Sequence, residues 1–213
     1  MLSRLRQQNY QIDSISLSLI TLQILVSFWL ATQYATSSPY TALVSVIYVT
    51  LTITGLSMHH FFCGGVKFDK TLIAKEISQL FLYIISGFLF VLVFQTIIFK
   101  TQTAGVIALN TFIDTTLFYA CAAISEESFF RFYIQTKLEQ SLPGFFGTFT
   151  AILLTSMLFT AFHFMVYRTA LFALLAVFAS SIVLCITYAY SKRLTVPMLI
   201  HVLTNLAAVL FAR

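Results

Sequence analysis

Two adjacent carboxylates, Glu126 and Glu127, stand with Arg131 at the end of a long apolar run. A charged side chain near a bilayer centre costs about 2.5 to 3.5 kcal/mol on insertion scales, so charges in such a place indicate a functional site. A solvated helix end at the membrane boundary would explain the same residues. Adjacent carboxylates in a low dielectric do not both ionise cheaply. Arg131 can therefore hold one of them ionised and leave the other as a candidate general base.

Two histidines, His163 and His201, lie within later apolar runs. Taken singly, each imidazole could simply be hydrogen-bonded to a neighbouring helix. Helical rise from the turn at Pro143 places Glu126 and His163 at heights that differ by roughly one turn, so the two side chains can face each other. His201 should lie about 12 Å into the membrane, shallower than His163 unless its helix tilts.

Three pairs of these residues stand four apart and therefore share a helix face. They are Glu127 with Arg131, Phe159 with His163, and His201 with Asn205. The spacing predicts that Glu127 pairs with Arg131 and that Glu126, about 100° round the helix, faces His163. Ala122 and Ala123, one turn earlier, offer a small surface on which a neighbouring helix can pack closely.

The composition indicates an integral membrane protein. Of 213 residues, 59% are hydrophobic and 9% are charged, and the mean hydropathy is +0.92, which excludes a water-soluble domain of this size. Apolar runs of about 20 residues favour helices, and the alternating pattern of a membrane barrel is missing from the sequence. The sequence therefore predicts an all-α polytopic membrane protein, one domain over residues 1–213 with about seven transmembrane helices.

The expected spans are approximately 15–34, 40–62, 77–99, a fourth from about 106, 149–167, 171–190 and 196–211. The fourth should continue past the glutamates as an amphipathic stretch up to the turn at Pro143-Gly144. Basic residues in the short loops predict a cytoplasmic N-terminus by the positive-inside rule. That orientation leaves Lys100, Arg168 and Arg213 outside and Arg4, Arg6, Lys67, Lys70, Lys75, Lys137, Lys192 and Arg193 inside. The net charge of +5 reflects this topology and needs no nucleic acid to explain it.

Cysteines and histidines outside the spans above give little sign of a metal centre. Cys63, Cys121 and Cys185 are far apart among apolar residues and predict buried thiols. His59, His60 and Cys63 are close enough for a metal site, but with no fourth ligand nearby we interpret them as interfacial side chains. No cofactor and no metal is expected.

The motifs Glu126-Glu127-x-x-x-Arg131, Phe159-x-x-x-His163 and His201-x-x-x-Asn205 follow one another on successive late helices. Together they resemble the three motifs of the CPBP family, which comprises type II CAAX prenyl endopeptidases and bacteriocin-processing or self-immunity proteins. The stretch Lys192-Arg193-Leu-Thr-Val-Pro197 leads into the third motif in the same way. The resemblance covers about residues 115–210 and leaves the first three spans unmatched. Phe132 departs from it, since family members often have Gly there, and we expect altered helix packing behind the site.

The resemblance implies an intramembrane glutamic endopeptidase without a cofactor. Glu126 would be the general base that activates water, His163 would hold that water, and His201 with Asn205 would form the oxyanion hole. Supporting positions would be Glu127, Arg131 and Phe159. The implied substrate is a membrane-associated peptide or a prenylated CAAX-type protein, with bacteriocin or peptide processing or self-immunity as possible roles in a bacterial cell membrane.

Other functions fit the same residues. A zinc metalloprotease could use Glu126, His163 and His201 as three protein ligands, although the sequence has no HExxH. A non-enzymatic immunity or regulatory protein could use the same groups as a structural polar network and act by binding a partner. A proton-coupled transporter is disfavoured because the ionisable groups cluster in the late helices and no pair of broken helices appears in corresponding halves.

Overall fold

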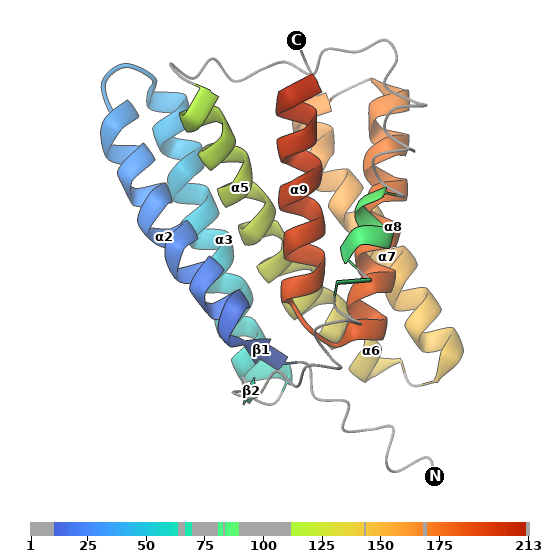
Figure 1. Cartoon of the computed structure of the whole chain (residues 1–213). Helices are drawn as coiled ribbons and strands as arrows, with labels where there is room; N and C mark the ends of the chain where they lie inside the picture. The colour runs from blue at the N-terminus through green and yellow to red at the C-terminus, as the bar shows by residue number, and fades with distance from the viewer. Residues whose placement is uncertain are drawn as a thin grey trace.

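The computed structural model describes residues 11–63, 67–69, 81–82, 84–89, 112–142, 144–167 and 170–211. These residues form a helical bundle in which α2 and α3 pack together at one edge and α5 lies beside them (Figure 1). Helix α9 packs against α5, and α7 and α8 form the other edge of the bundle. The start of α2 and the end of α9 lie at opposite ends of the bundle (Figure 1).

Helices α2 (Ser14–Tyr34) and α3 (Pro39–Cys63) match the first two expected spans. Pro39 opens α3, a position where its missing N–H costs nothing. In the seam between them, the buried faces of the two helices mix small polar residues with a few apolar ones, while many other apolar side chains of both helices are exposed. Gln23 donates to Ser27 Oγ at 3.1 Å and accepts from Thr52 Oγ1 at 3.0 Å. Small polar residues at the interface and apolar ones outside are the pattern of helices that pack in lipid.

Two short strands, β1 (Gln11–Asp13) and β2 (Lys67–Asp69), pair in parallel where α2 begins. The sequence analysis placed these residues in a polar N-terminal segment and a basic loop and expected no strand. Three residues are too few to show the alternation that marks a strand, so the pairing had no signal.

Helix α5 (Phe112–Phe129) carries both glutamates and continues through a π-helical segment, η1 (Phe130–Gln135), into α6 (Thr136–Ser141). The continuation toward Pro143 was expected, but the π-helix was not. The Thr136 hydroxyl donates to the Arg131 carbonyl at 3.3 Å and lies 3.0 Å from the Tyr188 hydroxyl. Gly55 of α3 lies against this helix, because a Cβ there would collide with the Ser128 carbonyl.

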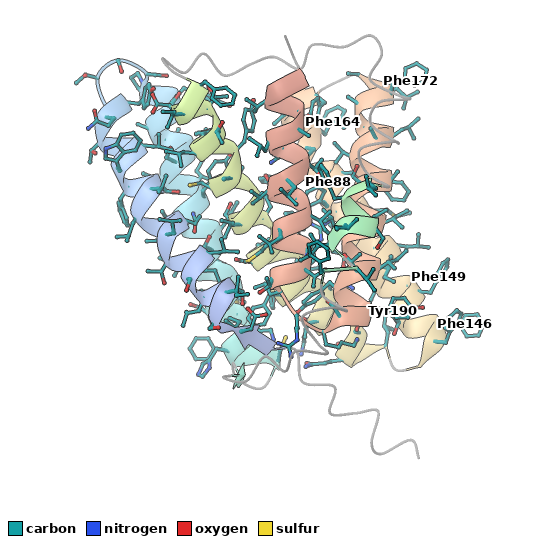
Figure 2. All side chains as sticks on the ribbon, in the orientation of Figure 1. Phe88, Phe146, Phe149, Phe164, Phe172 and Tyr190 are labelled. Atoms are coloured by element: carbon teal, nitrogen blue, oxygen red, sulfur yellow. The ribbon has the colours of Figure 1, made fainter. Side chains whose placement is uncertain are left out.

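Helix α7 (Phe145–Tyr167) begins about four residues earlier than expected, directly after Gly144, whose φ of +91° suits a residue without a side chain. Helix α8 (Leu171–Ser191) agrees closely with the sixth expected span. Figure 2 shows Phe146, Phe149 and Phe172 pointing away from the bundle, and all three are largely exposed. Such an apolar outer surface is what lipid contact requires.

Helix α9 (Thr195–Phe211) begins inside the bundle rather than at its rim. Leu194 and Thr195 are fully buried, whereas Phe145 at the start of α7 is 79% exposed. The buried Asp13 carboxylate fixes this start. It accepts from Thr195 Oγ1 and from the Ser16 backbone N–H, and it lies 3.9 Å from Arg193 Nη1. Helix α9 therefore has a recessed start, surrounded by its neighbours rather than exposed.

Four of the described helices, α2, α3, α7 and α8, are long and apolar enough to cross a membrane, and α9 is a shorter apolar helix. Helix α5 also crosses the bundle but carries three carboxylates, at Asp114, Glu126 and Glu127. In the third expected span, 77–99, residues 81–82 and 84–89 are helical and the others lie outside the described residues. The same holds for the expected start of the fourth span near residue 106. The chain is a helical membrane protein, as the composition predicted.

Candidate active site

Residues of all three motifs meet where α5, η1, α7 and α9 come together. The glutamates come from α5, Arg131 comes from η1, and the two histidines come from α7 and α9. Glu126 Oε2 lies 3.7 Å from His163 Nε2 and 3.9 Å from His201 Nε2. The structure therefore brings both histidines to one carboxylate oxygen, including His201, whose depth the sequence left open.

One oxygen of Glu126 has no direct partner among the described residues. The side chain is nearly buried, and this oxygen is Oε2. Separations of 3.7 and 3.9 Å are too long for direct hydrogen bonds. Polar atoms at such separations are commonly bridged by water, so one water molecule could touch Glu126 and an imidazole together.

His163 is held in a defined tautomer by its own helix. Its Nδ1 lies 2.9 Å from the Phe159 carbonyl oxygen. A carbonyl only accepts, so Nδ1 must carry the proton. In the neutral ring Nε2 is then an acceptor, and it points toward Glu126. The i,i+4 spacing of Phe159 and His163 thus acts partly through the backbone, because the carbonyl of Phe159 sets the tautomer.

Glu127 is fully buried and contacts two other side chains of the site. Its Oε1 lies 3.1 Å from Arg131 Nη1 and 2.8 Å from His201 Nδ1. The spacing pointed to the Arg131 pair, and the structure shows it. Nothing in the sequence indicated the contact between Glu127 and His201, because the two residues lie 74 positions apart on different helices. Glu127 thus orients the imidazole whose other nitrogen faces Glu126.

Arg131 has no exposed surface and is held by two other helices. Its Nη2 donates to Ser181 Oγ of α8 at 2.9 Å and to the Ser181 carbonyl at 3.4 Å. Its guanidinium lies over the Phe159 ring, 4.2 Å from the centroid, which is a cation–π arrangement. Phe159 is buried and serves this contact. The sequence did not single out Ser181, since a serine in an apolar helix is an ordinary packing residue.

Asn205 lies one turn beyond His201 on α9. Its Nδ2 donates to the backbone carbonyl of Tyr119 on α5 at 3.1 Å. This bond ties α9 to α5 and occupies one of the two amide protons of Nδ2. The second amide proton is the one that could serve an oxyanion.

Phe132, the departure from the family pattern, is fully buried behind the site. Its ring stacks on the imidazole of His59, with 3.7 Å between the centroids and 14° between the planes. The interpretation of His59 as an interfacial side chain is therefore wrong, because the aromatic ring that replaces Gly covers it. His60 is exposed, as an interfacial residue should be. Ala122 and Ala123, the expected packing surface, are also buried.

Within the described ranges, no group of three or more His, Cys, Asp or Glu side chains is arranged to hold a metal ion. A zinc ion at the site would have to draw on Glu126, His163 and His201. Their facing atoms are a carboxylate oxygen and two imidazole nitrogens, which are suitable zinc ligands by type. The chemistry of the donors thus keeps the zinc alternative open to experiment.

Comparison with known proteins agrees with the motif analysis. Residues 108–207 match the family described as type II CAAX prenyl endopeptidase Rce1-like, a family of membrane proteases. No curated protein and no solved structure matches the chain. The matched range contains all three motifs, from α5 to α9, and leaves α2 and α3 outside it. The family resemblance is confirmed: residues 108–207 are similar to the Rce1-like type II CAAX prenyl endopeptidases.

Proposed function

We propose that the protein is an intramembrane glutamic endopeptidase in which Glu126 activates water. The observation that carries this proposal is the convergence of His163 Nε2 and His201 Nε2 on the unpartnered Oε2 of Glu126. A buried carboxylate beside an imidazole with a free lone pair can bind a water molecule and take its proton. The membrane-protease family of residues 108–207 supports the same reaction class.

In the proposed reaction, water lies between Glu126 and His163 and attacks the carbonyl carbon of the scissile peptide bond. Glu126 takes one proton as the new C–O bond forms and later gives it to the departing amine as the C–N bond breaks. The oxygen of the tetrahedral intermediate accepts hydrogen bonds from His201 and from the second amide proton of Asn205. When His201 donates from both ring nitrogens, its positive charge faces the Glu127 carboxylate, which compensates it.

We further propose that the substrate is a membrane-associated peptide or a prenylated CAAX-type protein. The match of residues 108–207 to a family of CAAX prenyl endopeptidases supports this class. Processing of a bacteriocin-type peptide, or self-immunity, is a narrower form of the same proposal. We also propose a bacterial cell membrane as the location and a cytoplasmic N-terminus. The distribution of Lys and Arg among the loops supports the orientation.

The experiment is a cleavage assay on the purified full chain in lipid nanodiscs. A quenched-fluorescence peptide ending in a CAAX sequence is supplied with and without a farnesyl group, beside the matched Glu126→Gln variant. Wild type should cut at least one peptide, and the variant should lose about 10² to 10⁴-fold in rate, since its amide keeps the shape but takes no proton. An equally active Glu126→Gln variant would overturn the assignment of the base.

Metal content separates the glutamic mechanism from the zinc alternative. We expect active protein to carry no stoichiometric zinc in elemental analysis and to keep its rate in chelator. Stoichiometric zinc, with activity lost on chelation and restored by the metal, would assign Glu126, His163 and His201 as ligands instead. Specific binding of a peptide or protein partner without any cleavage would support the non-enzymatic alternative.

A further inference from the structure

Helix α8 carries none of the three motifs, yet one of its residues contacts the polar network of the site. Ser181 is fully buried, and its Oγ and its carbonyl both accept from Arg131 Nη2. The remaining contacts of Arg131 are the Glu127 carboxylate and the face of the Phe159 ring. Ser181 on α8 is therefore a neutral hydrogen-bond acceptor for Arg131, and Arg131 in turn contacts Glu127.

We propose that Ser181 is a positioning residue that sets the orientation of His201 through Arg131 and Glu127. The chain of contacts runs from Ser181 Oγ to Arg131 Nη2 at 2.9 Å and from Arg131 Nη1 to Glu127 Oε1 at 3.1 Å. It ends at His201 Nδ1, 2.8 Å from the same Glu127 oxygen. The inference rests on the proposed function only in that His201 serves the reaction.

The geometry explains why one hydroxyl group matters. Arg131 lies in the π-helical segment, where the backbone departs from regular α-helical spacing, and its Nε has no hydrogen-bond partner among the described residues. The guanidinium plane is set by the ion pair of Nη1 with Glu127, by the face of the Phe159 ring and by the hydrogen bonds of Nη2 to Ser181. Without the hydroxyl, Arg131 can swing about the Glu127 contact. Glu127 Oε1, which both Arg131 and His201 contact, then shifts and turns the imidazole with it.

Such outer contacts are known to control histidines at reactive sites. A carboxylate that accepts a hydrogen bond from Nδ1–H fixes the tautomer of the imidazole and the direction of its Nε2, as in catalytic triads and metal sites. Loss of an outer partner of this kind typically lowers activity by about 10 to 100-fold. Because Ser181 is fully buried and acts through Arg131, its effect should fall on kcat and leave KM unchanged.

The neighbouring Ser180 provides a matched control. It is half-buried on the same helix, and its Oγ has no hydrogen-bond partner among the described residues. Ser180→Ala removes the same hydroxyl group from the same apolar helix without touching Arg131. It should leave kcat, KM and thermal stability close to those of wild type.

The kinetic test compares Ser181→Ala, Ser181→Cys and Ser181→Thr with Ser180→Ala in the cleavage assay. Both Ala and Cys should lower kcat about ten-fold at unchanged KM, and Thr, which restores a hydroxyl, should recover most of the loss. The Cys variant nearly keeps the volume of serine and removes the strong acceptor, so it controls for a cavity. A kcat for Ser181→Ala or Ser181→Cys within two-fold of Ser180→Ala would overturn the proposal.

A second measurement tests the positioning without any turnover. The chain has four histidines, so ¹⁵N-histidine labelling gives few ring signals, and His201→Asn identifies those of His201. Ser181→Ala or Ser181→Cys should shift the His201 Nδ1 signal, and Ser180→Ala should not. An unchanged His201 signal would overturn the proposal even in an active enzyme. A shifted signal in a protein that cuts no peptide would leave the positioning intact and count against the proposed function alone.

Discussion

The α2–α3 seam and the region around Glu126 both bury polar side chains inside a membrane bundle, but they treat them differently. In the seam, the two polar atoms of Gln23 each have a partner, Ser27 and Thr52. In the site, Glu126 and Glu127 each have one buried oxygen without a hydrogen-bond partner among the described residues. Buried polar atoms are nearly always paired when their role is structural. What distinguishes the site from the contacts of Gln23 is that its unpaired atoms are carboxylate oxygens, which can take a proton.

The two regions also differ in charge. Neutral hydrogen bonds between membrane helices contribute on average about 0.6 kcal/mol each. Removal of one partner from a buried ion pair costs about 3 to 5 kcal/mol, because the other charge is left uncompensated. The network of Glu127, Arg131 and His201 is therefore costly to disturb, while the seam tolerates change. Mutations in the two regions should differ accordingly.

The largest effect on stability is expected at Glu127 and Arg131. Glu127→Gln leaves the buried Arg131 uncompensated and should lower the free energy of unfolding by about 3 to 5 kcal/mol. Arg131→Ala should cost a similar amount, because it leaves Glu127 without its cation. The double variant should lose less free energy of unfolding than the sum of the two single variants, since each change removes the charge that the other leaves unpaired. Unfolding by SDS titration in mixed micelles measures all four proteins, and strict additivity would contradict the pairing.

Gly55 is where the two regions meet, and we expect an intermediate effect there. A Cβ at this position would collide with the Ser128 backbone carbonyl, next to Glu127. Gly55→Ala should therefore force α3 away from α5 and lower the free energy of unfolding by about 1 to 3 kcal/mol. Cleavage should fall as well, because the displaced backbone carries the glutamates. Thermal unfolding and the peptide assay check both effects, with Thr50→Ala on the exposed face of α3 as the control.

Much of this organisation was predictable, because in a membrane protein sequence charge is rare and costly. Glu126, Arg131, His163 and His201 stand out against apolar runs, and those runs mark the spans. Features that arise from contacts between distant helices gave no such signal. Ser181 is one more small residue in an apolar helix, and the approach of His201 to Glu127 depends on the recessed start of α9.

The π-helix of residues 130–135 was also beyond sequence analysis, since Phe-Arg-Phe-Tyr-Ile-Gln has no helix-breaking residue. Two contacts of Thr136 accompany it: a local bond from its hydroxyl to the Arg131 carbonyl and a tertiary contact with the Tyr188 hydroxyl on α8. The role of Asp13 was equally hidden. By sequence it is an ordinary polar cap before the first span, and only the fold shows that its carboxylate also binds Thr195 at the start of α9. Local patterns therefore located the chemistry, while packing determined its geometry.

The smallest effect is expected in the seam, at Gln23. Gln23→Leu removes the partner of Ser27 and one of the two partners of Thr52, whose hydroxyl also donates to the Tyr48 carbonyl at 3.0 Å. Hydrogen bonds of this kind are worth at most about 1.7 kcal/mol in a membrane bundle, so the free energy of unfolding should fall by less than that. Cleavage by the folded variant should equal that of wild type, because α2 carries no residue of the site. The same SDS titration and peptide assay provide both numbers. A loss of stability as large as that of Glu127→Gln, or a loss of activity in fully folded protein, would show that the seam and the site are one coupled network rather than two regions with separate roles.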